Sequence, residues 1–347
     1  MTDGAGRAAA GSLSMTTLWP SRAGVAVVAA AFSIGLTLPE RLRYVPLVAS
    51  IVVIGLPHGA VDHLAVPRAR GETPTRRSLA RVGLLYLLVG GAYAGLWFLA
   101  PSLSVLLFIV MTWAHWGQGD LWPLLSVTGA DHLRSGAHRL GTVLVRGGLP
   151  MLVPIWFFPG RYRTVVEAIV GRFGVAGAAL DPFFDPEARA AVVGGLAILS
   201  ILVLLLGVLR TDDLETWAVD AGETGLLWWF FAAVPPVFAI GVYFTVWHSL
   251  RHVGRLIATD PDGRTALAAE RPFAAFARFA REATPLTLLS LLGLVGLYVA
   301  VPDPPGDVGE FIGLYLVFIA VLTLPHVVVV TAMDAEQGVW RTVSRKS

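Results

Sequence analysis

Long uncharged apolar stretches recur along this chain of 347 residues, and several reach the roughly 20 residues that a helix needs to cross the hydrocarbon core of a bilayer. Charged residues make up 14% of the chain, whereas soluble proteins carry about a quarter. This composition excludes a water-soluble enzyme. It predicts an all-α fold, a polytopic integral membrane bundle of helices.

We expect eight to ten transmembrane helices in a single membrane domain, residues 21–335. A flexible lead-in, residues 1–20, precedes this domain, and a basic tail, residues 336–347, follows it. One of the ten candidates contains Glu167 and Arg172, so it could instead be a re-entrant or interfacial helix. The expected spans are 23–38, 44–66, 79–99, 103–119, 140–158, 190–209, 225–247, 283–301, 311–333 and the weaker 164–180.

Arginines gather in the loops after the second expected span and after Trp247. Because basic residues mark the cytoplasmic ends of spans, these loops and both termini are expected in the cytoplasm, in a multi-pass protein of the cell membrane. The net charge of +2 comes from such loop arginines, so it indicates no nucleic-acid partner. The chain has no cysteine, which leaves imidazole and oxygen ligands for any metal.

Six of the eight histidines lie within or at the end of expected spans. Ionisable groups at membrane depth are costly and are usually functional. A single one could be a neutral histidine that donates a hydrogen bond to another helix. Several at similar depth predict a shared site instead. The six are His58, His63, His115, His248, His252 and His326.

The strongest motif is His248-Ser-Leu-Arg-His252. Its four-residue spacing places both imidazoles on one face of a helix, within reach of one ion. Arg251, between them, is expected to extend to water or to a lipid headgroup near the interface.

A second motif holds His58, Asp62 and His63. Positions 58 and 62 share a helix face, whereas position 63 points roughly 140° away from position 58, so the two histidines are not expected to bind one metal together. Asp62 could accept the ring N–H of a ligating histidine. Alternatively, Asp62 and His63 form an ordinary polar cap, and for His63 both interpretations stay open.

The third motif centres on His115, between Trp113 and Trp116, which share a helix face and could wall an apolar cavity or belong to the interfacial aromatic belt. His326 follows Pro325 and could be a ligand, a residue behind the ligands or a helix–helix hydrogen bond. The aromatic residues best placed to wall a cavity are those that flank histidines, namely Trp116, Tyr243, Phe244 and Trp247.

Neutral imidazoles without thiolates suit iron, zinc or copper. The chain lacks a His-Glu-x-x-His box, which argues against a zincin protease, and its spans lack the set of carboxylates that a proton-coupled pump uses. The remaining hypothesis that needs the fewest assumptions is an enzyme that uses O₂ to oxidise an apolar substrate.

Four segments together resemble the Brp/Blh family of membrane β-carotene 15,15′-dioxygenases. They are 57–63 (PHGAVDH), 113–117 (WAHWG), 247–252 (WHSLRH) and 324–326 (LPH). The resemblance implies that His58, His115, His248 and His252 bind Fe(II), and that His63 and His326 lie behind the ligands or in a channel. It also implies cleavage of the central double bond of β-carotene by O₂ to give two all-trans-retinal molecules, supplied to a microbial rhodopsin.

Two alternatives stay open. The His248-x-x-x-His252 pair also resembles a box of membrane desaturases and hydroxylases, whose di-iron site needs about twice as many ligands. A metal or small-molecule transporter with a histidine-lined path is the second alternative.

Overall fold

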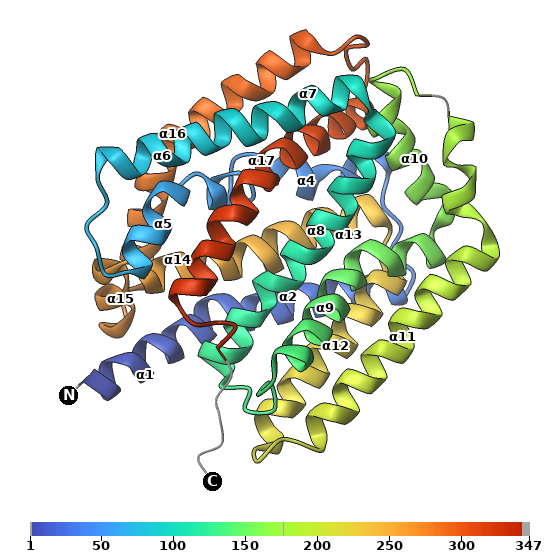
Figure 1. The fold of residues 1–347 in the computed structure, drawn as a ribbon. Helices are drawn as coiled ribbons and strands as arrows, with labels where there is room; N and C mark the ends of the chain where they lie inside the picture. The colour runs from blue at the N-terminus through green and yellow to red at the C-terminus, as the bar shows by residue number, and fades with distance from the viewer. Residues whose placement is uncertain (1, 176, 342–347) are drawn as a thin grey trace.

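The computed structural model describes residues 2–175 and 177–341, and every regular element among them is a helix (Figure 1). Within these ranges, five helical stretches are long and apolar enough to cross a membrane. They are residues 76–99 and the helices α9 (Gly136–Phe157), α11 (Pro186–Val208), α16 (Pro272–Ala300) and α17 (Val308–Glu336). The predicted all-α, polytopic membrane class is therefore confirmed.

The count of eight to ten spans, the cytoplasmic termini and the domain limits stay predictions. Half of the predicted basic tail, residues 342–347 with Arg345 and Lys346, lies outside the described residues. The segment expected as a flexible lead-in is helical, because helix α1 (Thr2–Leu13) runs through a π-helical turn into α2 (Trp19–Ser33), and its flexibility stays a prediction. Ala9 and Leu13 are buried in one apolar cluster with Leu267 of α15 (Pro261–Ala268), which gives this segment a tertiary partner that the sequence did not reveal.

Three expected spans are interrupted, and in the weaker one, 164–180, α10 (Pro159–Gly171) ends before the 3₁₀ segment Gly177–Phe184 begins. The stretch 44–66 divides into α4 (Val45–Ser50), a single 3₁₀ turn (Pro57–Gly59) and α5 (Asp62–Ala69). A Cβ on Gly55 would lie 2.6 Å from the Cβ of Ser50 and 2.8 Å from the Phe244 ring, so only glycine allows the chain to fold back this tightly. The stretch 225–247 breaks where α12 (Leu214–Ala233) ends and α13 (Pro236–Val242) begins.

The remaining elements connect these helices. A π-helical segment, Tyr243–Ser249, joins α13 to α14 (Leu250–Thr259), and another π-helical turn, Tyr86–Gly90, joins α6 (Arg76–Leu85) to α7 (Gly91–Leu99). The others are α3 (Glu40–Arg43), α8 (Pro101–Pro123) with its π-helical extension Leu124–Thr128, α10 (Pro159–Gly171) and the 3₁₀ segment Gly177–Phe184.

Helices α8 and α9 cross very closely at two glycines. A Cβ on Gly117 would lie 2.7 Å from the carbonyl carbon of Val143, and a Cβ on Gly147 would lie 2.8 Å from that of Trp113. Small residues allow such backbone approach between membrane helices. In Figure 1, α8 runs through the middle of the molecule between α9 and α17, so this crossing fixes the position of a central helix.

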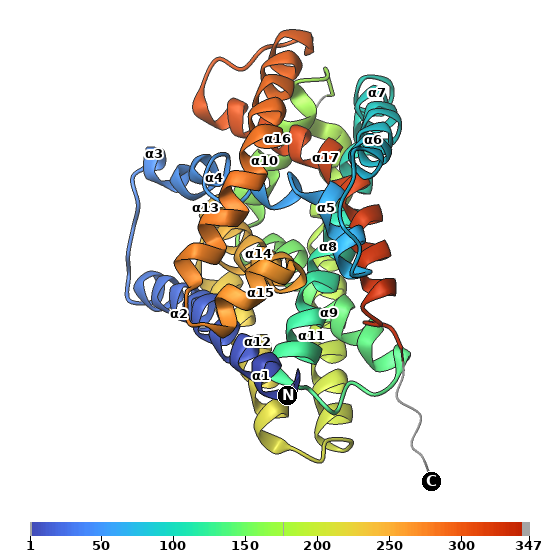
Figure 2. The same cartoon turned by 90° about the vertical axis from the view of Figure 1, so that its left-hand side faces the viewer.

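The upper half of the molecule in Figure 2 is built from α16 on one side and the α6–α7 helix on the other, with α10 and α17 seen between them. Apolar side chains cover the outward faces of these helices, among them Leu84, Leu87, Leu289 and Leu292. Such faces suit contact with lipid.

Candidate metal centre

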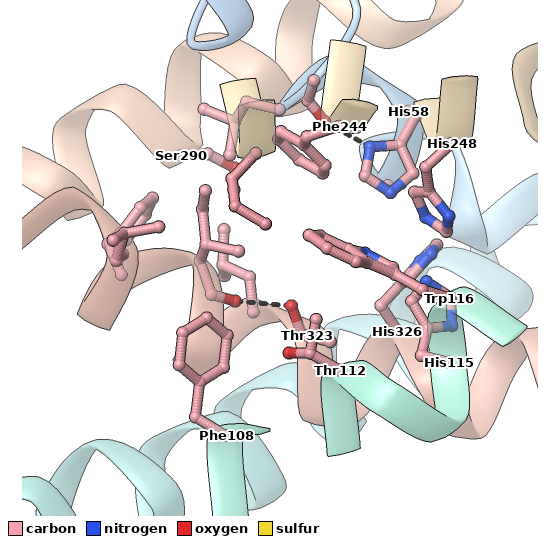
Figure 3. Close-up of a pocket in the computed structure, with 18 of the residues that line it drawn as sticks. His58, Phe108, Thr112, His115, Trp116, Phe244, His248, Ser290, Thr323 and His326 are labelled. Atoms are coloured by element: carbon pink, nitrogen blue, oxygen red, sulfur yellow. Dashed lines mark hydrogen bonds between the residues drawn. The ribbon is translucent and has the colours of Figure 1, made fainter. Parts of the chain in front are cut away.

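Five histidine rings from distant parts of the chain gather at one buried point (Figure 3 labels four of them). The ring centroids of His115 and His248 lie 4.8 Å apart, and those of His58 and His252 lie 5.6 Å apart. His326 joins them, with its centroid 4.9 Å from those of both His58 and His115. The structure thus brings together all four histidines predicted as ligands and adds His326.

Each histidine is carried by a distinct structural feature. His58 lies in the interrupted segment between α4 and α5, whereas His115 lies within α8 and His326 within α17. His248 lies in the π-helical segment and His252 in α14, and their rings are nearly parallel, 6° apart. Short π-helical segments inside α-helices are frequent at functional sites.

Several buried ring nitrogens in this cluster have no hydrogen-bond partner among the described residues. They are both ring nitrogens of His115 and the Nε2 atoms of His248 and His326. One ligand atom each from His58, His115 and His326 lies within 4.8 Å of the other two. Leaving buried polar atoms unpaired costs free energy, and a metal ion would satisfy several of them at once. The cluster therefore fits a metal.

Hydrogen bonds outside the cluster orient two of the rings. Asp62 accepts a hydrogen bond from Nδ1 of His326 at 2.9 Å and another from the hydroxyl of Tyr86 at 2.7 Å. Nδ1 of His58 is hydrogen-bonded to the carbonyl oxygen of Gly55. Asp62 thus accepts the ring N–H of a histidine in the cluster, as one interpretation of its motif predicted, and that histidine is His326. No sequence signal marked Tyr86.

A cavity of about 430 Å³ leads away from the histidines. Figure 3 shows the four labelled histidines at one end of it and Ser290 at the other. Its wall is mostly apolar and is formed by residues of α6, α8, α10, α13, α16 and α17. The sequence had indicated only part of this wall, chiefly the aromatic residues that flank histidines. Trp116, Phe244, Asp62 and His63 line it, together with Thr112, a buried hydroxyl that the sequence did not single out.

Two aromatic residues predicted for this wall, Tyr243 and Trp247, do not line the cavity. Tyr243 packs behind Trp116, with ring centroids 4.9 Å apart. Trp247 is fully buried, and its indole N–H donates to Asp120 of α8 at 2.9 Å. The ring of Tyr243 contacts Phe231 of α12. Trp247 therefore links the helix of His115 to the segment that carries His248.

We infer that the cavity opens between α6 and α16, because both helices contribute lining residues that are exposed. Leu79 of α6 and Leu289 of α16 both line it, and both are exposed, at 42% and 60%. Each belongs to one of the five stretches that can cross a membrane. If both stretches cross the bilayer, an opening between them faces lipid rather than water.

The expectation that Arg251 reaches water is wrong. Its side chain is 2% exposed, pairs with Glu223 at 2.8 Å and lies 3.5 Å over the ring of Trp247. Arg146 joins the same network of buried charges through Glu223, at 3.2 Å, and also pairs with Asp220 at 2.7 Å. The spans thus bury more carboxylates than their sequences indicated. Residues 120, 220 and 223 stand near the ends of apolar stretches, and folding encloses them with arginines.

Comparison with known proteins gives three informative relatives. A protein of Halobacterium salinarum described as "Probable beta-carotene 15,15'-dioxygenase Blh" is 51% identical over 305 residues, 88% of each chain. A second protein of that organism, "Probable beta-carotene 15,15'-dioxygenase Brp", is 30% identical over 96% of this chain and 95% of its own. A "Beta-carotene 15,15'-dioxygenase" of uncultured marine bacterium 66A03 is 34% identical over 119 residues, 30% of this chain and 43% of its own.

No solved structure matches the chain. The model of the family described as "Beta-carotene 15,15'-dioxygenase" matches residues 49–334, which include every histidine of the cluster. These findings confirm the resemblance that the four motifs predicted. The chain belongs to the β-carotene 15,15′-dioxygenase family.

Proposed function

We propose that this protein is a membrane non-haem iron dioxygenase that cleaves the central 15,15′ double bond of β-carotene with O₂ into two all-trans-retinal molecules. In this reaction one carbon–carbon double bond breaks and each of its carbons gains one oxygen atom of O₂. Both oxygen atoms enter product, so no further reductant is required. The observation that carries the proposal is a buried histidine cluster at the end of an apolar cavity that opens toward lipid, in a chain of this family.

In this proposal His58, His115, His248 and His252 hold Fe(II). The unpaired ring nitrogens of His115 and His248 support it, and so does the absence of cysteine from the sequence. Bound iron with open coordination positions would supply the activation of O₂.

The rest of the chemistry lies in how the protein holds the substrate. β-Carotene has no polar group that could be hydrogen-bonded, so its position along the cavity must select the bond that breaks. Trp116 and Phe244 flank the histidines and would hold the polyene against them. The apolar wall excludes water from the reacting carbons.

The same proposal places the protein in the cell membrane, with substrate taken from the bilayer through the opening between α6 and α16. Retinal is apolar enough to leave by the same route. A microbial rhodopsin in the same membrane would be its acceptor.

The test is expression in carotene-producing bacteria with retinal measured by chromatography. We expect bleaching and retinal with the wild-type protein, and loss of retinal in His248→Ala. His132→Ala is the matched control, because His132 is buried and lies outside the cluster. Purified protein given ¹⁸O₂ should label retinal from both halves. Full retinal yield from His248→Ala, or two irons per chain as in a di-iron desaturase, would refute the proposal.

A further inference from the structure

His326 is as well placed for a metal as the histidines predicted to bind one. Its side chain is buried, and its ring centroid lies 4.9 Å from those of His58 and His115 and 5.2 Å from that of His252. The compact triple of nitrogen ligand atoms, all within 4.8 Å of one another, contains His326 together with His58 and His115. A position this central is unexpected for a residue that only joins two helices.

The two nitrogens of the His326 ring have different surroundings. Nδ1 lies 2.9 Å from a carboxylate oxygen of Asp62, so in the neutral ring Nδ1 carries the proton and donates it. Nε2 then carries the lone pair, and it is buried without a hydrogen-bond partner among the described residues. A helix–helix hydrogen bond would account for Nδ1 alone. The unpaired Nε2 requires a second partner, and a cation supplies one.

Asp62 is itself held in place. The hydroxyl of Tyr86 donates to the same carboxylate at 2.7 Å, and both residues are at the cavity wall. A carboxylate that accepts the ring N–H of a histidine fixes its tautomer and orientation and makes the other nitrogen a better metal ligand. Tyr86, Asp62 and His326 form such a chain from the π-helical turn after α6 through α5 to α17.

We propose that His326 is a further ligand of the metal and that Asp62, held by Tyr86, is its positioning residue. This inference rests on the proposed function, since it assumes that the cluster binds a metal. It assigns two residues beyond the four histidines that the family resemblance implied.

The experiment measures metal binding by the full-length protein in detergent, independently of catalysis. Iron content is determined by elemental analysis, affinity by competition with a chelator, and ligand geometry by the visible spectrum of the Co(II)-loaded protein. We expect His326→Ala to lower metal affinity by about 10–100-fold and to change the Co(II) spectrum. Asp62→Asn keeps the shape but loses the charge, so we expect about a tenfold loss and a smaller spectral change.

His132→Ala is the matched control. His132 is also buried and is also hydrogen-bonded to a buried aspartate, Asp220, at 3.0 Å, but it lies outside the cluster. It should lose stability while it keeps the wild-type metal affinity and Co(II) spectrum.

The outcomes separate the two proposals. Wild-type protein that binds no metal would overturn the proposed function. Wild-type protein that binds one metal, with unchanged affinity and spectrum in both His326→Ala and Asp62→Asn, would overturn the assignment of His326 alone. If His326→Ala does not fold, Asp62→Asn decides, because it removes no volume from the core.

Discussion

The crossing of α8 and α9 provides a direct test of how tightly the metal centre depends on helix spacing. We predict that Gly147→Ala disrupts it. The added Cβ would lie 2.8 Å from the carbonyl carbon of Trp113 and 2.9 Å from the backbone nitrogen of Gly117, and the carbonyl oxygen of Trp113 is nearer still. Ordinary contact begins near 3.4 Å, so the two backbones must separate by at least 0.6 Å, the difference between 3.4 and 2.8 Å.

These atoms belong to backbone, which has no flexible end that could move aside. Overpacking of this kind costs about 1–3 kcal/mol of stability. Trp113 stands two residues before His115, so the shift reaches the metal centre, where a misplacement of about 1 Å is worth roughly 10²-fold in rate. We therefore expect a lowered melting temperature in detergent and a loss of retinal of about that size.

Gly194→Ala is the matched control for this prediction. Gly194 also lies in a candidate membrane-spanning helix, α11, but a Cβ there meets nothing within 4 Å. The same chemical change should leave retinal yield unaltered and raise helix stability by up to about 1 kcal/mol. A Gly147→Ala protein with wild-type melting temperature and wild-type retinal yield would refute the packing argument.

Three further predictions concern the cavity opening, the buried charges and a loop. Gly83 lines the cavity, and a Cβ there would meet nothing within 4 Å. Gly83→Phe should therefore plug the opening and abolish retinal formation while the iron content stays normal. Gly91 is equally open but does not line the cavity, so Gly91→Phe should leave retinal formation unchanged. Glu223→Ala removes the closest carboxylate partner of the buried Arg251 guanidinium, at 2.8 Å, and one of the partners of Arg146. It should cost about 3–5 kcal/mol, measured by thermal unfolding, and an unchanged melting temperature would contradict this. Partial burial raises the pKa of Asp131, but hydrogen bonds, including one from Thr211, outweigh it and hold the pKa below its ordinary value. Its stabilisation is therefore present above the unfolded pKa of about 4 and lost as pH falls through the lower folded pKa, so Asp131→Asn should flatten the acid side of the stability–pH curve.

Much of the site could be predicted because histidines are rare in apolar spans, where burying an ionisable group costs free energy. The pairing of His248 with His252 follows from helical periodicity alone, and the structure brings both to His58 and His115. Similar depth in the membrane predicted a shared site, whereas the choice of these four histidines as its ligands came from the family resemblance.

Other features depend on contacts between distant segments and leave no local trace. Tyr86 looks like any aromatic residue of a span until Asp62 is placed beside it. In the sequence, Arg251 resembles an interfacial arginine. Its charge can be buried because Glu223, from another helix, neutralises it. The interruption near His58 was partly visible in Pro57 and Gly59, but the close contact at Gly55 depends on Phe244, nearly two hundred positions away.

The opening between α6 and α16 changes what concentration means for this protein. If substrate arrives only from the surrounding lipid, turnover depends on the mole fraction of carotene in the membrane plane and not on its amount per volume of buffer. Diluting a vesicle suspension tenfold with buffer would leave the rate per protein unchanged, whereas fusing the same vesicles with carotene-free lipid would lower it. The lipid composition of the host membrane thereby becomes a determinant of retinal supply.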